Sequence, residues 1–272
     1  MQAEDIRGGV LAEVLAIVRN RRGIDFSGYR RATIERRLLN RMVAARAASA
    51  AEYLHGLRAS DGETDRLIAT LTVKVSRFFR NAAVFDTLRD VVLPDLRTRF
   101  PGEALRLWSA GCGQGEEAYT LAMLLGDTRG DVLGTDVDGS ALAAAAGGCY
   151  PDRALHELPA AHVAAFVDRA GPGTVAVRDA VRRRVRFAFH DLAAAERPPA
   201  GGPFHLVCCR NVVIYFDPVL QRRAMRLLVD SLRPGGVLCL GEAEWESDLA
   251  GVLEPIDRRR KLYRRAAEPS GR

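Results

Sequence analysis

The chain has 272 residues, 48% of them hydrophobic, which is enough for the core of one large domain or of one domain plus a smaller one. No apolar run approaches the roughly 20 residues of a transmembrane helix, and the first residues include acids where a signal peptide would be basic and then apolar. The net charge of +6 comes almost entirely from arginine, and its distribution along the chain is uneven.

The five cysteines predict reduced thiols. Their number is odd, they show no C-x-x-C spacing, and several fall in predicted strands or tight turns. This usage favours a cytoplasmic protein with buried thiols over a disulfide framework, and it offers no metal site.

The first ninety residues carry the period of amphipathic helices. Apolar side chains recur at helical spacing over residues 9–20 and 29–47, and shorter helical patterns cover 50–58 and 63–73. We therefore predict an all-helical N-terminal domain over residues 1–90.

Basic residues gather in this helical domain. Between residues 19 and 46 there are nine arginines against two acids. Arg30, Arg37 and Arg41 have i, i+7 and i+11 spacing, which places them on one face of a helix. The pattern fits either the solvated face of an ordinary helix or a surface that docks an acidic partner, protein or nucleic acid.

An α/β pattern follows a helix over 82–96 and a linker over 91–103. Leu105 to Trp108 reads as a buried strand, and glycines at 111, 113 and 115 precede a helix that begins at Glu116. Further strands are expected at 132–135, 185–189, 204–209 and 237–240, with helices at 139–147 and 218–232.

This order of elements predicts a doubly wound, mostly parallel, Rossmann-like sheet over residues 104–267. Residues 150–183 are rich in proline and glycine and have a shorter period. We expect them to form a small inserted subdomain.

Polar residues stand where the predicted strands end. Asp136 closes the second strand about 25 residues after the glycine loop, where such folds place the acid that binds ribose hydroxyls. Asp191 closes the third strand, where its carboxylate could accept an adenine amino group, and Arg210-Asn211 ends the next. An N-cap is the competing interpretation of Asp136.

The glycine loop indicates the kind of nucleotide. Its G-x-G-x-G spacing differs from the dinucleotide pattern, and Glu116 and Glu117 follow directly. These acids would repel a pyrophosphate at the helix N-terminus but attract an amino group or a sulfonium. The loop therefore favours S-adenosyl-L-methionine over NAD or ATP, and Arg233-Pro-Gly-Gly236 is a turn common in class I methyltransferases.

Four segments together resemble the chemotaxis receptor methyltransferase family, CheR. They are Ser-Arg-Phe-Phe-Arg (76–80), Trp-Ser-Ala-Gly-Cys-Gly-Gln-Gly-Glu-Glu-Ala-Tyr (108–119), Thr-Asp-Val-Asp (135–138) and Cys-Arg-Asn-Val-Val-Ile-Tyr-Phe-Asp (209–217). The resemblance spans nearly the whole chain. It implies a class I methyltransferase fold with a helical N-terminal domain and a small inserted antiparallel β subdomain.

The resemblance also implies an activity. The family transfers the methyl group of S-adenosyl-L-methionine to glutamate side chains in the cytoplasmic helical bundle of chemoreceptors, leaving S-adenosylhomocysteine, and the methyl esters serve sensory adaptation. The helix over 29–47, with Arg30, Arg37 and Arg41, would dock the receptor, and we expect a cytoplasmic monomer. Carried over residue by residue, the cofactor would contact Ser76, Arg80, Gly111, Gly113, Glu116, Asp136, Asp191, Leu192, Arg210 and Asn211, while Arg80 and Tyr215 would flank the reacting carboxylate.

Several residues depart from the family pattern. Lys74 stands where the family has Asn, Asp191 replaces the Asn before Leu192, and Gly241-Glu-Ala-Glu244 replaces Gly-His-Ser-Glu. The turn at Gly171-Pro-Gly173 is short, so we hypothesise that no receptor tether binds the inserted subdomain. Lys74 and Glu242 keep open a non-catalytic module that binds S-adenosyl-L-methionine or acts as a scaffold.

A methyltransferase acting on nucleic acid is the remaining alternative. The arginine excess would permit it, but the sequence has neither an N/D-P-P-Y/F motif for amino-nitrogen methylation nor a Pro-Cys nucleophile. Aromatic residues in the basic stretch are limited to Phe26 and Tyr29, too few for a stacking platform. We therefore expect a protein substrate, no nucleic-acid partner and no membrane insertion.

Overall fold

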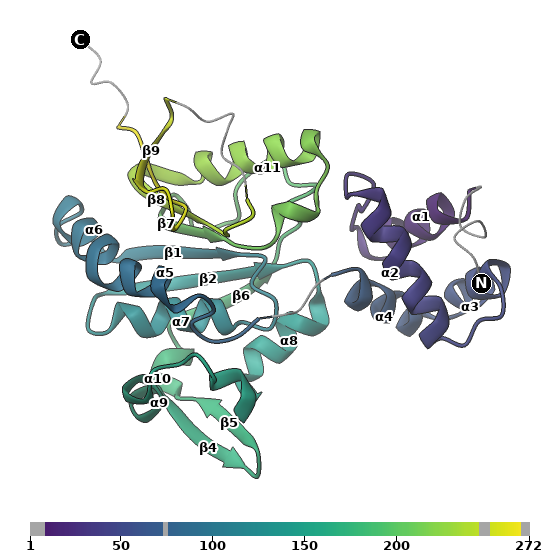
Figure 1. The fold of residues 1–272 in the computed structure, drawn as a ribbon, viewed down its shortest axis with the longest axis horizontal. Helices are drawn as coiled ribbons and strands as arrows, with labels where there is room; N and C mark the ends of the chain where they lie inside the picture. Colours follow the sequence, from purple (N-terminus) through teal and green to yellow (C-terminus); the bar gives the residue numbers. More distant parts are fainter. Residues whose placement is uncertain (1–8, 73–75, 245–250, 268–272) are drawn as a thin grey trace.

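A computed structural model describes residues 9–72, 76–244 and 251–267. Figure 1 shows a central sheet covered by helices, a separate helical domain on one side, and a small β subdomain below the sheet. None of the helices in these three ranges is both long and apolar enough to span a membrane.

The N-terminal helical domain has its own hydrophobic core. Ile34, Leu38 and Met42 of the second helix recur every four residues and are buried against the other three helices. Ser49 and Ser60 cap the next two helices by accepting hydrogen bonds from backbone N–H groups one turn on. Over residues 9–72 the helices are α1 (Val10–Arg22), α2 (Arg31–Ala44), α3 (Ala50–Ala59) and α4 (Asp61–Leu71).

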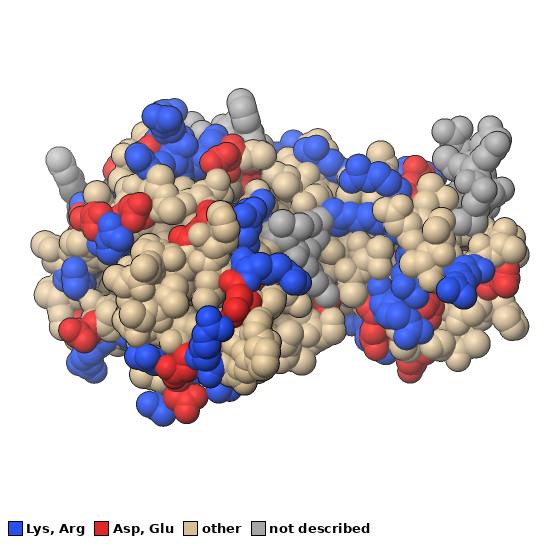
Figure 2. Space-filling view, turned by 60° about the horizontal axis from the view of Figure 1, so that its bottom comes forward, with Lys and Arg blue, Asp and Glu red and all other residues tan. Residues whose placement is uncertain are grey.

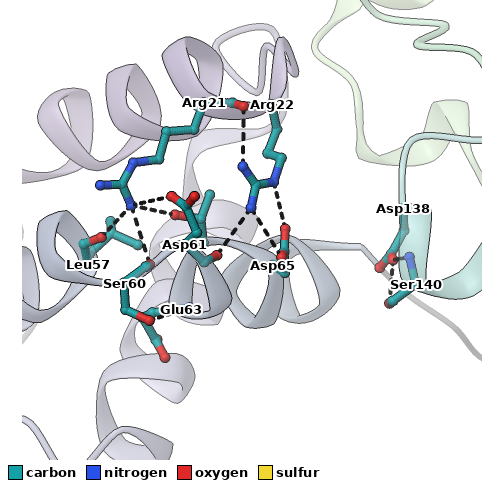
Figure 3. Close-up of polar contacts among 10 residues, drawn as sticks. Arg21, Arg22, Leu57, Ser60, Asp61, Glu63, Asp65, Asp138 and Ser140 are labelled. Atoms are coloured by element: carbon teal, nitrogen blue, oxygen red, sulfur yellow. Dashed lines mark hydrogen bonds and ion pairs between the residues drawn. The ribbon is translucent and has the colours of Figure 1, made fainter.

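Much of the arginine excess in this domain is engaged in internal contacts. Figure 3 shows the side chains of Arg21 and Arg22 reaching from α1 to the region of α3 and α4. Arg21 Nη1 donates to the Leu57 carbonyl at 2.7 Å, and Arg22 Nε donates to the Asp65 carboxylate at 2.7 Å. These arginines therefore join the helices to one another.

The next helical segment covers the sheet. Leu88 and Val92 are buried in the same cluster as the helix that follows the glycine loop. Residues 82–90, which the helical pattern assigns to the N-terminal domain, pack on the sheet instead. The segment comprises α5 (Ala82–Thr87), the π-helical turn η2 (Leu88–Val92) and α6 (Leu93–Arg99).

The central sheet has the strand order β6-β2-β1-β7-β8-β10-β9. Its strands from β6 to β8 are parallel, and β9 and β10 add an antiparallel hairpin that the sequence analysis did not predict. The strands are β1 (Leu105–Ala110), β2 (Gly130–Asp136), β6 (Val185–Phe189), β7 (Phe204–Cys209), β8 (Leu232–Leu240), β9 (Leu253–Asp257) and β10 (Leu262–Arg265).

Both faces of the sheet are buried. On β7, Leu206 and Cys208 pack toward α5, α6 and α7 (Glu116–Leu125), whereas Val207 and Cys209 pack toward α11 (Pro218–Asp230). Successive side chains of a strand point to opposite faces. The predicted doubly wound, mostly parallel sheet is thus confirmed. Its remaining helices are α7 (Glu116–Leu125), α8 (Gly139–Gly147) and α11 (Pro218–Asp230), the last preceded by the turn η4 (Val213–Tyr215).

The small inserted subdomain is a three-stranded antiparallel sheet of order β3-β5-β4, as expected. A tight turn joins β4 to β5 at the position of the short glycine turn. Its elements are β3 (Cys149–Pro151), η3 (Asp152–Leu155), α9 (Ala160–Phe166), β4 (Val167–Gly171), β5 (Thr174–Val177) and α10 (Asp179–Arg182).

Candidate functional site

A cavity opens where the carboxyl ends of β1, β2, β6 and β7 meet the helical domain. Neighbouring parallel strands end at the same edge of a sheet, so residues far apart in the chain gather here. The residues predicted to contact the cofactor or the reacting carboxylate that line it are Ser76, Arg80, Gly111, Gly113, Asp136, Leu192, Arg210, Asn211 and Tyr215. Lys74 lies outside the described residues.

The glycine loop presses closely on its neighbours. The N–H of Gly111 donates to the Thr135 carbonyl at 2.8 Å, and a Cβ on Gly111 would collide with Val212 Cγ2. Gly113 N–H donates to Asp136 Oδ2 at 2.9 Å. The backbone of the loop is therefore held at the ends of β2 and β7 with no room for a side chain at position 111.

Carboxyl groups are concentrated around the cavity. Burial raises the pKa of Glu116, of Asp136 and of Asp191. One oxygen of Glu116, Oε2, has no hydrogen-bond partner among the described residues. A ligand with positive charge and with amino and hydroxyl donors would complement these groups, as S-adenosyl-L-methionine would, whereas a pyrophosphate would be repelled.

The two acids after the glycine loop have different environments. Glu117 lines the cavity, accepts a hydrogen bond from Ser109 Oγ at 2.7 Å and forms an ion pair with Arg210 Nη1 at 3.4 Å. Glu116 is 4% exposed and does not line it, although its side chain is hydrogen-bonded to Ser76. The role of Glu116 at the methionyl end of the cofactor stays a prediction.

Asp191 also lies behind the wall of the cavity. Its carboxylate accepts hydrogen bonds from the backbone N–H of Ala193 at 2.8 Å and of Asp25, in the helical domain, at 3.4 Å. Leu192, the next residue, lines the cavity. The predicted contact of Asp191 with adenine is not tested by this arrangement.

Arg210 holds the segment that carries Arg80. Its Nη2 donates to the Arg80 carbonyl and to Asn81 Oδ1, both at 2.9 Å. The Arg210 side chain is buried, and Glu117 balances its charge. Arg210 therefore ties the Arg80 segment to the end of β7, in addition to lining the cavity.

The inserted subdomain holds the same segment from the other side. Phe78 N–H donates to the Ala154 carbonyl at 3.3 Å, and Asn81 N–H donates to Glu157 Oε2 at 2.9 Å. Glu157 also pairs with Arg77 at 3.2 Å. These contacts give the subdomain a direct part in placing Arg80.

The helical domain holds the segment that carries Tyr215. Arg30 N–H donates to the Tyr215 carbonyl, and Asp217 N–H donates to the Gly28 carbonyl, both at 2.8 Å. The rings of Tyr29 and Phe216 meet edge to face with their centroids 4.8 Å apart. A short antiparallel bridge between Tyr29 and Phe216 therefore fixes the backbone on both sides of Phe216, the residue that follows Tyr215.

The three arginines predicted to dock a partner all contact their own chain. Arg30 Nε donates to the Phe216 carbonyl at 3.2 Å. Arg37 lines the cavity, with its guanidinium carbon 4.8 Å from the centroid of the Tyr215 ring. Arg41 makes two hydrogen bonds to Glu63, at 2.7 and 2.8 Å. Their part in docking stays a prediction.

His190 is a cavity residue that the sequence analysis missed. It follows β6, and its Nε2 is buried without a hydrogen-bond partner among the described residues. Burial lowers the pKa of the imidazole, which favours its neutral form. Its place immediately before Asp191, at a strand end, is the signal that would have identified it.

Comparisons with known proteins agree with this architecture. Residues 10–72 match the family domain described as "CheR methyltransferase, all-alpha domain", and residues 74–261 match "CheR methyltransferase, SAM binding domain". The chain is 34% identical to a chemotaxis protein methyltransferase of Listeria monocytogenes over 246 residues, 89% of each chain. It is also 34% identical to that of Escherichia coli over 239 residues, which cover 84% of this chain and 81% of the other.

Proposed function

Because the chain belongs to the CheR methyltransferase family, we propose that it transfers the methyl group of S-adenosyl-L-methionine to glutamate carboxylates in the cytoplasmic helical bundle of chemoreceptors. The observation that carries the proposal is that Arg80 and Tyr215 line the same cavity as the glycine loop and Asp136. The names of the relatives, chemotaxis protein methyltransferases, support a receptor as the substrate. The methyl esters would serve sensory adaptation.

The substrate needs orientation more than activation. A glutamate carboxylate, with a reference pKa of about 4.3, is already ionised at neutral pH, so the site requires no general base. Bound S-adenosyl-L-methionine supplies an electrophilic methyl group on a sulfonium sulfur and leaves as neutral S-adenosylhomocysteine. The protein must therefore hold one carboxylate oxygen in line with that methyl group at roughly 3–3.5 Å.

Arg80 and Tyr215 have the chemistry for this orientation. The Arg80 guanidinium offers a planar fork of N–H donors that matches a carboxylate. The Tyr215 hydroxyl offers one further donor in the same cavity. Together they would fix the carboxylate from two sides and leave one oxygen directed at the methyl group.

The remaining lining residues would hold the cofactor. Asp136 would accept hydrogen bonds from the ribose hydroxyls, and Gly111 and Gly113 would let the cofactor approach the backbone. Ser76, and Glu116 from behind the cavity wall, would meet the methionyl end, and the positively charged amino group of the cofactor would offset the negative charge of the buried carboxylates. The adenine would lie near Leu192, with Asp191 behind it.

A receptor bundle would dock beside the cavity on the helical domain. Figure 2 shows Lys and Arg side chains spread over the visible face of the molecule with Asp and Glu side chains among them. Because this face carries both signs of charge, docking would depend on local contacts. Arg30 and Arg37 stand close to the Tyr215 segment, where a bound receptor would present its glutamate. Arg41 would first have to exchange Glu63 for a receptor carboxylate.

Methyl-ester formation tests the proposal. The protein is incubated with methyl-labelled S-adenosyl-L-methionine and chemoreceptor-bearing membranes, and methanol released by alkali is counted, with cofactor binding measured separately. Wild-type protein should give base-labile label. The Arg80→Ala variant should lose on the order of 100-fold in rate, because the carboxylate is no longer aligned, while its Tm is largely kept. Cofactor binding without base-labile label on any receptor would favour the non-catalytic module instead.

A further inference from the structure

We propose that Arg37 is a positioning residue that holds the Tyr215 ring in its place in the cavity and so couples helix α2 to methyl transfer. The effect on methyl transfer rests on the proposed function. The contact between Arg37 and Tyr215 is observed independently of it. The guanidinium carbon of Arg37 lies 4.8 Å from the centroid of the Tyr215 ring. An arginine over an aromatic face at this distance is attracted by the electrons of the ring.

The guanidinium of Arg37 is itself held in place. Its Nη1 donates to the carbonyl of Leu71, the last residue of α4. The final carbonyls of a helix have no partner within it and carry partial negative charge, so they suit a cation. The neighbours Ile34 and Leu38 are buried in the core of the domain and fix this turn of α2. Arg37 therefore presents a fixed plane to the tyrosine.

The Tyr215 side chain can rotate about χ1 and χ2, and the Arg37 guanidinium against its ring would restrict that rotation. Its backbone is bonded on both sides, with N–H donating to the Val212 carbonyl at 3.2 Å and C=O accepting from Arg30 at 2.8 Å. These bonds fix the Cα atom but not rotation about χ1 and χ2, which decides where the hydroxyl points. The half-buried ring packs against the core cluster that includes Val213 and Phe216, and Arg37 lies over its face.

The arrangement joins docking to chemistry. Helix α2 carries Arg37 to the cavity, and the N-terminal end of the same helix is bonded to the Tyr215 segment through Arg30. A receptor that shifts α2 would shift the plane on which the tyrosine rests. Arg37 thus acts on the reaction through Tyr215, apart from any contact that it makes with the receptor.

A double-mutant cycle separates this role from simple docking. We compare Arg37→Ala, Tyr215→Phe and the double variant at saturating cofactor and receptor, with the exposed neighbour Arg36→Ala as the charge-matched control. Arg37→Ala should lower kcat about tenfold in the wild-type background. In the Tyr215→Phe background it should lower kcat no further, because there is no hydroxyl left to place.

One further variant and the control distinguish the possible outcomes. Arg37→Lys keeps the charge but not the planar fork, so it should restore only part of kcat. Arg36→Ala should leave kcat unchanged. Equal losses from Arg37→Ala in both backgrounds, or a higher KM for receptor with kcat intact, would overturn the inference and make Arg37 a docking residue.

A measurement without turnover keeps the inference separate from the proposed function. The rings of ¹³C-labelled tyrosines are observed by NMR, and the Tyr215 signal is assigned by its loss in Tyr215→Phe. Arg37→Ala should move or broaden that signal and leave the signal of Tyr119, buried beneath the sheet, in place. An unchanged Tyr215 signal overturns the inference. Wild-type protein that transfers no methyl group while the signal responds contradicts the proposed function alone.

Discussion

Glu244 lies beneath the loop that leads from β7 to Tyr215. Its Oε1 accepts the Val212 N–H at 2.9 Å, and its other oxygen packs so closely on Gly241 that a Cβ there would collide with it. Burial raises the pKa of this carboxyl to about 7. The charge of Glu244 therefore changes near neutral pH.

The raised pKa has a defined effect on stability. The folded protein retains the Glu244 proton up to about pH 7, whereas the unfolded chain releases it near the ordinary value of 4.5. The unfolded state therefore binds fewer protons between these values, and the free energy of unfolding falls as pH rises through that window. In Glu244→Gln this contribution is absent, while the amide oxygen can still accept the Val212 N–H.

Chemical unfolding of both proteins across the same pH range measures the effect. The stability of the Gln variant relative to wild type should rise by up to about 3 kcal/mol between the two pKa values and stay constant above them. Parallel stability curves for the two proteins would show that Glu244 titrates normally.

The sequence predicts that two acids follow the glycine loop, but it does not predict which of them faces the cavity. Glu116 and Glu117 begin the same helix, and only the packed structure shows that Glu117 faces Ser109 and Arg210. Those partners lie on β1 and just after β7, at sequence distances that no local pattern records. Which residues line the cavity was therefore easier to predict from the sequence than which residues they contact.

At the scale of elements, the inserted subdomain supports the segment of Arg80. Glu157 follows η3 and accepts the N–H of Asn81, whose φ of 62° is unusual for a residue with a side chain. The same carboxylate pairs with Arg77. The subdomain thereby holds both flanks of the segment that delivers Arg80 to the cavity.

Removal of this support should affect the rate of methyl transfer. Glu157→Ala takes away the acceptor for Asn81 N–H, so Arg80 should be aligned less often and kcat should fall about tenfold. Glu157→Gln keeps an acceptor oxygen and should lie close to wild type. Steady-state methylation assays measure both, with Asp168→Ala, which removes an exposed ion pair to Arg178 in the same subdomain, as the control. A loss of kcat in Asp168→Ala equal to that in Glu157→Ala would contradict a specific role for Glu157.

The distribution of charged residues along the sequence was the least reliable predictor of how the helices contact one another. The nine arginines between residues 19 and 46 looked unbalanced because their acidic partners, such as Glu63 and Asp65, belong to another helix. The hairpin of β9 and β10 was missed for a related reason. Leu-Glu-Pro-Ile-Asp in β9 alternates weakly and contains a proline, so pairing with β10 rather than local propensity makes it a strand.

At the scale of the whole molecule, three units meet at one cavity. The sheet provides the glycine loop and Asp136, the inserted subdomain supports Arg80, and the helical domain supports Tyr215. The convergence of strand ends could be predicted, since it follows from the parallel order of the sheet. The contacts between units could not, because each joins short segments with no periodic signal.

The site of methylation on the receptor tests this account most directly. A purified chemoreceptor is incubated with the protein and S-adenosyl-L-methionine, digested, and its peptides are mapped by mass spectrometry before and after mild base. We expect one added methyl group on glutamate residues of the helical bundle, removed by base and missing when Arg80→Ala replaces the wild-type protein. Unmodified glutamates despite bound cofactor, or a base-stable methyl group on another residue type, would contradict it.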